Sequence, residues 1–197
     1  VDRLVSVASQ TSGSELTMTE YDIVKANSQT LAAVAGYRGK GQRRLGSDTD
    51  AEWIESIAVT TEFLRTLGLS PALGREFTRE ETSPGGASTI VLSDALWRRR
   101  FDRDPAIVGR TVSLDGRPAT IVGVLPPGFW FPQSVDVLVP LRASGGLEDL
   151  GTNTQVLARL KDDVSLSRAQ SELAAMTETL DKAEAEKELT RLRRQWF

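Results

Sequence analysis

Prolines and glycines recur so closely between Pro71 and Pro140 that this part of the chain has room only for short elements. Proline fixes its own backbone and donates no hydrogen bond, and glycine favours turns, so long periodic segments are interrupted. The dipeptide Asp115-Gly116 supplies the positive φ angles of a tight hairpin turn, and Ser93 is expected to cap a short helix. Short apolar runs predict strands at 90–92, 112–114, 119–124 and 135–139. The sequence therefore predicts a compact, mainly β unit in the middle of the chain.

Longer periodic elements lie on both sides of this unit. The spacing of apolar residues predicts strands at 3–7, 52–59 and 154–160, and helices at 17–30 and from Ser165 or Ser167 onward. In the first helix, Thr19 and Asp22 have the spacing of a capping box. A glycine-rich, charged stretch, 36–46, separates this helix from the strand at 52–59. The apolar stripe of the last helix consists of Leu166, Ala169, Leu173, Met176 and Leu180.

Composition removes several classes of function. The chain has 197 residues, 40% of them apolar, and it contains neither Cys nor His. Thiolate chemistry, cysteine zinc sites and most histidine-dependent hydrolase mechanisms are therefore excluded. The net charge of -3 argues against nucleic acid as a partner. The tight basic cluster Arg98-Arg99-Arg100 is expected to be a solvated helix face.

The motifs for phosphate and calcium binding are incomplete. Lys40 is followed by glycine where a phosphate-binding loop needs Ser or Thr, so we expect no binding or hydrolysis of ATP by this chain. Asp48, Asp50 and Glu52 imitate the start of a calcium loop, but Trp53 stands where the sharp turn requires glycine. We therefore predict no metal, no cofactor and no catalytic residue. The carboxylate pairs Glu80-Glu81 and Asp162-Asp163 are expected to have structural roles at turns or helix starts.

The order of the motifs resembles the extracytoplasmic core domain of MacB-type ABC transporter permeases, within the FtsX-like permease superfamily. The segments that carry the resemblance are Val59–Gly68, Pro71–Phe77, Leu92–Phe101, Asp104–Arg110, Asp115-Gly116, Ile121–Phe129 and Asp136–Pro140. The resemblance extends from about Asp2 to Leu180. It is strongest to the orphan permeases in which this module is duplicated.

The resemblance implies an α+β fold with two subdomains. Residues 1–70 and 150–197 would form a membrane-proximal, porter-like subdomain of strands and helices, built from both chain ends. Residues 71–149 would form a β-rich distal subdomain inserted into it. No apolar run reaches the roughly 20 residues needed to span a bilayer. The family therefore implies an extracytoplasmic loop of a cell membrane protein, with membrane helices before Val1 and after Phe197.

The resemblance also implies a function and partners. The domain would couple movement of the transmembrane helices to export or other periplasmic work, and it would not be catalytic by itself. Its partners would be its own transmembrane helices, a cytoplasmic ATPase subunit or domain, and a second permease copy or half. A periplasmic adaptor is left open. The alternative is a binding module for a peptide, a lipid or a cell-wall hydrolase, which predicts an apolar groove between the subdomains; an enzyme that uses carboxylates ranks third.

Three consecutive aromatic residues, Phe129, Trp130 and Phe131, are the strongest candidate for a partner surface. Each would remove about 150 to 250 Å² from water when buried, so leaving all three exposed would be unfavourable. They are either packed against the β unit or kept for a partner. Because this segment belongs to the fold signature of the family, packing is the favoured interpretation.

Overall fold

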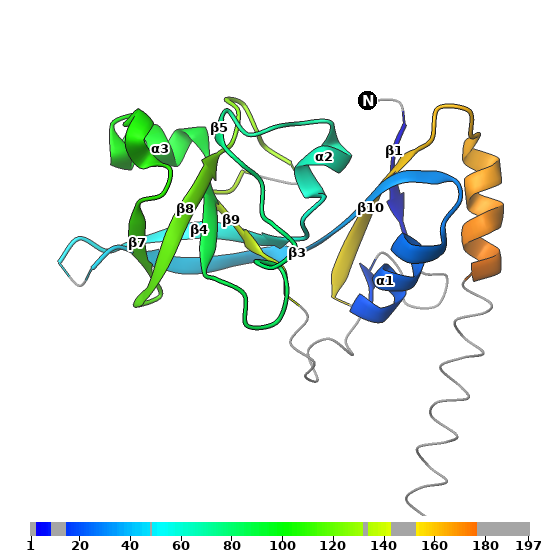
Figure 1. Cartoon of the computed structure of the whole chain (residues 1–197), viewed down its shortest axis with the longest axis horizontal. Coiled ribbons are helices and arrows are strands. Elements are labelled where there is room, and N and C mark those ends of the chain that lie inside the picture. Colours follow the sequence, from blue (N-terminus) through cyan, green and yellow to red (C-terminus); the bar gives the residue numbers. More distant parts are fainter. Residues whose placement is uncertain (1–2, 9–14, 48, 132–133, 143–152, 177–197) are drawn as a thin grey trace, which may run out of the picture.

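The structure, a computed structural model, describes residues 3–8, 15–47, 49–131, 134–142 and 153–176. These residues form an α+β fold on one ten-stranded mixed sheet, which confirms the predicted fold class (Figure 1). The strands are β1 (Leu4–Val7), β2 (Glu15–Leu16), β3 (Leu31–Leu45), β4 (Glu52–Val59), β5 (Leu73–Gly74), β6 (Thr89–Leu92), β7 (Thr111–Leu114), β8 (Arg117–Val124), β9 (Val137–Pro140) and β10 (Thr154–Leu160). The helices are α1 (Met18–Asn27), α2 (Phe63–Leu67), α3 (Asp94–Phe101), the 3-10 turn η1 (Pro105–Ile107) and a last helix described over 166–176.

The strands follow the order β1-β10-β3-β4-β9-β6-β8-β5, with β2 beside β10 and β7 beside both β3 and β8. The pairings of β4 with β9 and of β6 with β8 are parallel. The other pairings within the described residues are antiparallel. The predicted strands at 52–59 and 154–160 match β4 and β10 residue for residue.

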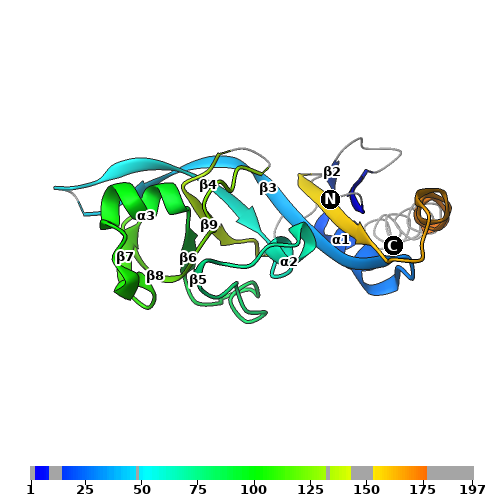
Figure 2. The same cartoon turned by 90° about the horizontal axis from the view of Figure 1, so that it is seen from above.

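Strand β3 is 15 residues long and runs from one end of the molecule to the other (Figures 1 and 2). Its first half, Leu31 to Tyr37, pairs with β10. Its second half, Tyr37 to Leu45, pairs with β4, with a register shift between Arg38 and Gly41. The glycine-rich stretch 36–46 is therefore mostly strand. One strand joins the part built from the chain ends to the part that holds the middle of the chain.

Three clusters of buried apolar side chains lie along this axis. The end cluster, beside α1 and the last helix, includes Tyr21, Val24, Val34, Val156 and Ala169. The central cluster includes Tyr37, Ile57, Phe63, Val91 and Leu125. The tip cluster, beneath α3 and the β7–β8 hairpin, includes Leu45, Ile54, Leu96, Phe101 and Ile121. The division into 1–70 with 150–197 and 71–149 stays a prediction.

Local sequence signals explain most element boundaries. Asp115 and Gly116 have φ angles of 52° and 75°, which confirms the predicted hairpin turn between β7 and β8. The hydroxyl of Ser93 accepts a hydrogen bond from the backbone of Leu96 at 3.1 Å and begins α3, as predicted. The hydroxyl of Ser165 accepts one from the backbone of Arg168 at 3.2 Å at the start of the last helix.

The predicted capping box of the first helix was wrong. Thr17, rather than Thr19, is the cap, and its hydroxyl accepts a hydrogen bond from Glu20 N at 3.1 Å. The carboxylate of Glu20 accepts one from Thr17 N at 2.6 Å. The glutamate side chain is long enough to reach back one turn, which completes the box at these positions. The helix ends at Asn27, before the predicted residue 30, because the chain becomes extended at Ser28.

The predicted stripe of the last helix is only partly buried. Ala169 is buried, Leu173 packs at the edge of the end cluster, and Leu166 is 52% exposed. Leu180 lies outside the described residues. Among the described helices, none combines the length and the apolar character that a membrane crossing requires.

Candidate functional site

Several contacts between distant parts of the chain meet at the junction between the end cluster and the central cluster, where β3 passes from one to the other. Gly36 N donates a hydrogen bond to Thr60 Oγ1 at 3.0 Å, and Thr60 N donates to Gly36 O at 3.0 Å. The backbone bond continues the β3–β4 pairing beyond Tyr37 and Val59, and the Thr60 hydroxyl stands in for a backbone carbonyl as the acceptor for Gly36 N. Through Thr60, the turn after β4 is hydrogen-bonded directly to Gly36, where β3 passes from the end cluster to the central cluster.

An ion pair connects α1 to the start of α2 at this junction. Lys25 Nζ lies 2.8 Å from Glu62 Oε1, and about a third of each side chain is exposed. Burial lowers the pKa of Lys25, but its hydrogen bond to Glu62 and the charge of neighbouring groups outweigh burial and raise the pKa. The pair lies between two cavities of about 210 and 200 Å³, both of which it lines. The second cavity is lined mainly by hydroxyl and charged side chains, among them Asp22, Thr61 and Arg79.

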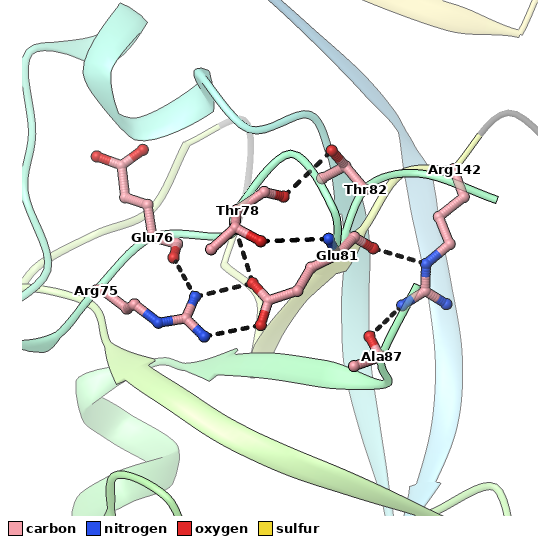
Figure 3. A network of polar contacts seen from close by, with 7 residues as sticks. All are labelled: Arg75, Glu76, Thr78, Glu81, Thr82, Ala87 and Arg142. Carbon is pink, nitrogen blue, oxygen red and sulfur yellow. Dashed lines mark hydrogen bonds and ion pairs between the residues drawn. The ribbon is translucent and has the colours of Figure 1, made fainter. Parts of the chain in front are cut away.

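The loop from 75 to 87 is fixed by a network of polar contacts (Figure 3). Arg75 and Glu81 form a bidentate ion pair with two nitrogen–oxygen distances of 2.8 Å. Thr78 N donates to the same carboxylate at 2.8 Å. The hydrogen bonds from Arg75 lower the pKa of Glu81 although its residue is only 7% exposed. Glu81 has the structural role that was predicted for it.

Arg142 holds this loop from the other side. Its Nε donates to the backbone oxygen of Glu81 at 2.8 Å, and its Nη2 donates to the backbone oxygen of Ala87 (Figure 3). The hydroxyls of Thr61 and Thr82 lie 2.9 Å apart and share a hydrogen bond. The loop is therefore tied both to the segment that follows β9 and to the turn that follows β4.

Glu172 on the last helix clamps the turn between α1 and β3. Its carboxylate accepts hydrogen bonds from Ser28 Oγ at 3.0 Å and from Thr30 N at 3.1 Å. It also accepts from Gln29 N and from the hydroxyl of Thr30. Burial raises the pKa of Glu172, but these hydrogen bonds, with that of the Thr30 hydroxyl first among them, outweigh it and lower the pKa. The last helix is thus bonded to the residues that lead directly into β3.

The three consecutive aromatic residues differ in burial. Phe129 and Phe131 pack against the central cluster. The Phe131 ring meets Tyr37 edge to face with centroids 6.0 Å apart, and it lies 6.4 Å from the Phe63 ring. Trp130, in contrast, is 67% exposed. A partner surface over Phe129, Trp130 and Phe131 stays a prediction, and Trp130 is the side chain available to it.

Two acidic residues of the incomplete calcium motif, Asp50 and Glu52, have nearby cationic partners. Asp50 pairs with Arg100 at 2.9 Å, and Glu52 pairs with Arg99 at 3.3 Å. Asp48 lies outside the described residues. Within the part of the chain that the structure describes, no group of three or more acidic residues is placed to hold a metal ion. The junction contacts of Lys25, Arg142 and Glu172 were not predicted, because no local pattern marks residues whose partners lie far away in the chain.

Comparison with known proteins gives consistent matches. The sequence model of the family described as MacB-like periplasmic core domain matches residues 1–176. The macrolide export ATP-binding/permease protein MacB 1 of Yersinia pestis bv. Antiqua (strain Antiqua) is 26% identical over 157 residues. The match covers 78% of this chain and 24% of that protein, so the chain spans about a quarter of the length of this relative.

Two solved structures share the fold. The periplasmic region of MacB from Actinobacillus actinomycetemcomitans aligns with a TM-score of 0.65 and 17% identity, over 85% of this chain and 75% of that one. The extracellular domain of the noncanonic ABC-type transporter YknZ from Gram-positive bacteria aligns with a TM-score of 0.61 and 17% identity, over 91% of this chain and 93% of that one.

Proposed function

The chain belongs to the MacB-like periplasmic core domain family, and on this premise we propose that it couples movement of transmembrane helices to work outside the membrane, without catalysis of its own. The proposed setting is an ABC transporter permease of the cell membrane, with this segment extracytoplasmic. The proposed partners are its own transmembrane helices, a cytoplasmic ATPase subunit or domain, and a second permease copy or half. Membership of the duplicated orphan group stays a prediction.

The observation that carries this proposal is the continuous connection along β3. Glu172 bonds the last helix to residues 28–30, and β3 begins at Leu31 and ends at Leu45 in the tip cluster. Within a sheet, neighbouring strands share backbone hydrogen bonds, so a displacement of one end of β3 strains the pairings along its length. In this proposal the part built from the chain ends receives the movement, and β3 carries it to residues 71–149 on the distal side.

The proposal is tested in the full-length permease with its ATPase. Spin labels are attached at Arg168→Cys on the last helix and Arg103→Cys beyond α3, both exposed positions in a segment that has no cysteine of its own. Pulsed electron paramagnetic resonance measures the separation of the labels with and without a non-hydrolysable ATP analogue. We expect the analogue to shift the distribution of separations.

A second variant links the shift to the proposed route. Glu172→Gln removes the charge that accepts four hydrogen bonds, so the shift should shrink while ATP hydrolysis continues. The matched control is Gln170→Ala, an exposed change on the same helix, which should leave the shift intact. An unchanged label separation in the otherwise unaltered protein would refute coupling.

A further inference from the structure

A cavity of about 390 Å³ lies at the tip of the molecule, among the β3–β4 loop, the end of α3 and β7. Figure 1 shows α3 and β7 at the opposite end of the molecule from the last helix. Two arginines, Arg100 and Arg110, line the cavity together with the hydroxyl side chains of Ser47, Thr111 and Ser113. This combination offers many hydrogen-bond donors and two positive charges.

The guanidinium group of Arg110 is positioned by an aromatic ring and not by a carboxylate. Its guanidinium carbon lies 5.7 Å from the centroid of the Phe101 ring, and Phe101 is buried in the tip cluster. The Arg110 backbone bonds to Ile107 and Ile121, but among the described residues its guanidinium group donates no hydrogen bond and forms no ion pair. Stacking on an aromatic ring restricts a guanidinium group but uses none of its five N–H donors. The Phe101 ring therefore restricts the Arg110 guanidinium group at the cavity and leaves its N–H donors available to a ligand.

Arg100 already binds a carboxylate through one of its nitrogens. Its Nη2 donates to Asp50 Oδ2 at 2.9 Å and to Asp50 O at 2.8 Å. Gly46 makes room for this arginine, since a Cβ at that position would lie 2.6 Å from Nη2. Hydrogen bonds from Ser47 to Asp50, together with the charge of Arg100, lower the pKa of the Asp50 carboxyl. The cavity is thus lined by the guanidinium groups of two arginines and by the carboxylate of Asp50.

We propose that this cavity is a binding site for an oxyanion, a carboxylate or phosphate group of a ligand, held by the fork of Arg110 with help from Arg100. A guanidinium group matches the two oxygens of such an anion with two parallel hydrogen bonds. Ser47 already donates its hydroxyl to Asp50. The oxygens that remain would therefore accept from the hydroxyl groups of Thr111 and Ser113. Asp50 competes with the ligand, because it supplies the single negative charge among these cavity-lining groups.

The test is a nuclear magnetic resonance titration of the chain with sodium phosphate and, separately, with sodium acetate, at constant ionic strength set with sodium chloride. We expect saturable shifts of the backbone amide signals of Gly46, Ser47 and residues 111–113 with at least one anion. The anion that binds more tightly identifies the group as phosphate or carboxylate. Absence of saturable shifts with both anions would overturn the proposal.

Matched variants separate a specific site from general charge attraction. Arg110→Gln should weaken binding by about tenfold or more, the usual effect of losing a charged hydrogen-bonding partner. Arg103→Gln is the control, because Arg103 stacks on Trp97 at 5.6 Å in the same manner but does not line the cavity. Equal losses in both variants would contradict a defined site. Asp50→Asn should strengthen binding, and unchanged or weaker binding in that variant would also count against the proposal.

Discussion

Gly36 lies so close to Thr154 that a Cβ on Gly36 would stand 3.0 Å from Cγ2 of that residue. The same atom would stand 3.4 Å from the side chains of Thr60 and Tyr21. Position 36 is therefore surrounded by β10, α1 and the turn after β4. The absence of a side chain allows these elements to meet at the point where β3 leaves the end cluster.

Enlarging this residue should destabilise the fold. Gly36→Val inserts three carbon atoms into a packed junction, and overpacking of this kind typically costs about 1–3 kcal/mol of unfolding free energy. Urea denaturation measures the change. Gly39→Ala is the control in the same strand, since no atom lies within 4 Å of its added Cβ, and it should be neutral or slightly stabilising. If Gly39→Ala lost as much unfolding free energy as Gly36→Val, the cause would lie in the strand as a whole and not in the packing at the junction.

Acid should weaken the loop network through Glu81. Its folded-state pKa is lower than its ordinary value of 4.5, so its contribution is complete above that value and is lost as the pH falls through the folded pKa. Glu81→Gln should cost about 1–3 kcal/mol at pH 7, because the charged pairing with Arg75 is lost. The difference in unfolding free energy between the parent protein and Glu81→Gln, measured by denaturation, should be smaller at pH 3 than at pH 7.

The exposed Asp163 provides the control for this pH dependence. Asp163→Asn should leave the unfolding free energy nearly unchanged at both pH values, as surface substitutions usually do. The interpretation fails if the stability difference between Glu81→Gln and the parent protein is the same at pH 7 and pH 3.

Glu172→Gln should loosen the last helix from the turn at 28–30. The neutral amide can no longer accept charge-assisted hydrogen bonds on both oxygens, so local opening becomes more frequent. Hydrogen exchange of the amides of Gln29 and Thr30, both of which donate to Glu172, should accelerate by about tenfold, the equivalent of one lost charged hydrogen bond. Arg168→Gln changes a charge on the same helix and should leave these amides unaffected. Equal exchange rates in the parent protein and both variants would show that the hydrogen bonds to Glu172 do not protect these amides.

Replacement of Phe131 by alanine should destabilise the protein much more than replacement of Trp130. Phe131→Ala removes ring contacts with Tyr37 and Phe63 and should cost about 3 kcal/mol of stability, the lower end of the usual range for this substitution. Trp130→Ala should change stability by less than about 0.5 kcal/mol, because the side chain is 67% exposed. Thermal unfolding distinguishes the two. If Trp130 belongs to a partner surface, its variant should lose activity in the full-length permease at normal abundance, whereas unaltered activity would remove it from that role.

Elements that depend on neighbouring residues could be predicted from the sequence. Strands β4 and β10, the Asp115-Gly116 turn and the Ser93 cap follow from side-chain alternation, positive φ and a local hydroxyl, all of which act over a few residues. The family could also be inferred, because the order of such motifs is a property of the linear chain. The capping box was misplaced by two residues, since a glutamate three residues after Thr17 can reach back to the cap, whereas the shorter Asp22 stands three residues after Thr19.

The connections between these elements depend on contacts between distant parts of the chain, which local patterns do not predict. Residues 36–46 have no clear strand pattern, yet they extend β3, because β10 and β4 supply their backbone partners. Glu172 and Thr30 are 142 residues apart, and Arg142 and Glu81 are 61 apart. No local preference encodes such pairs. Their contacts arise when segments far apart in the chain pack together around the sheet, and this packing creates both the junction and the proposed route along β3.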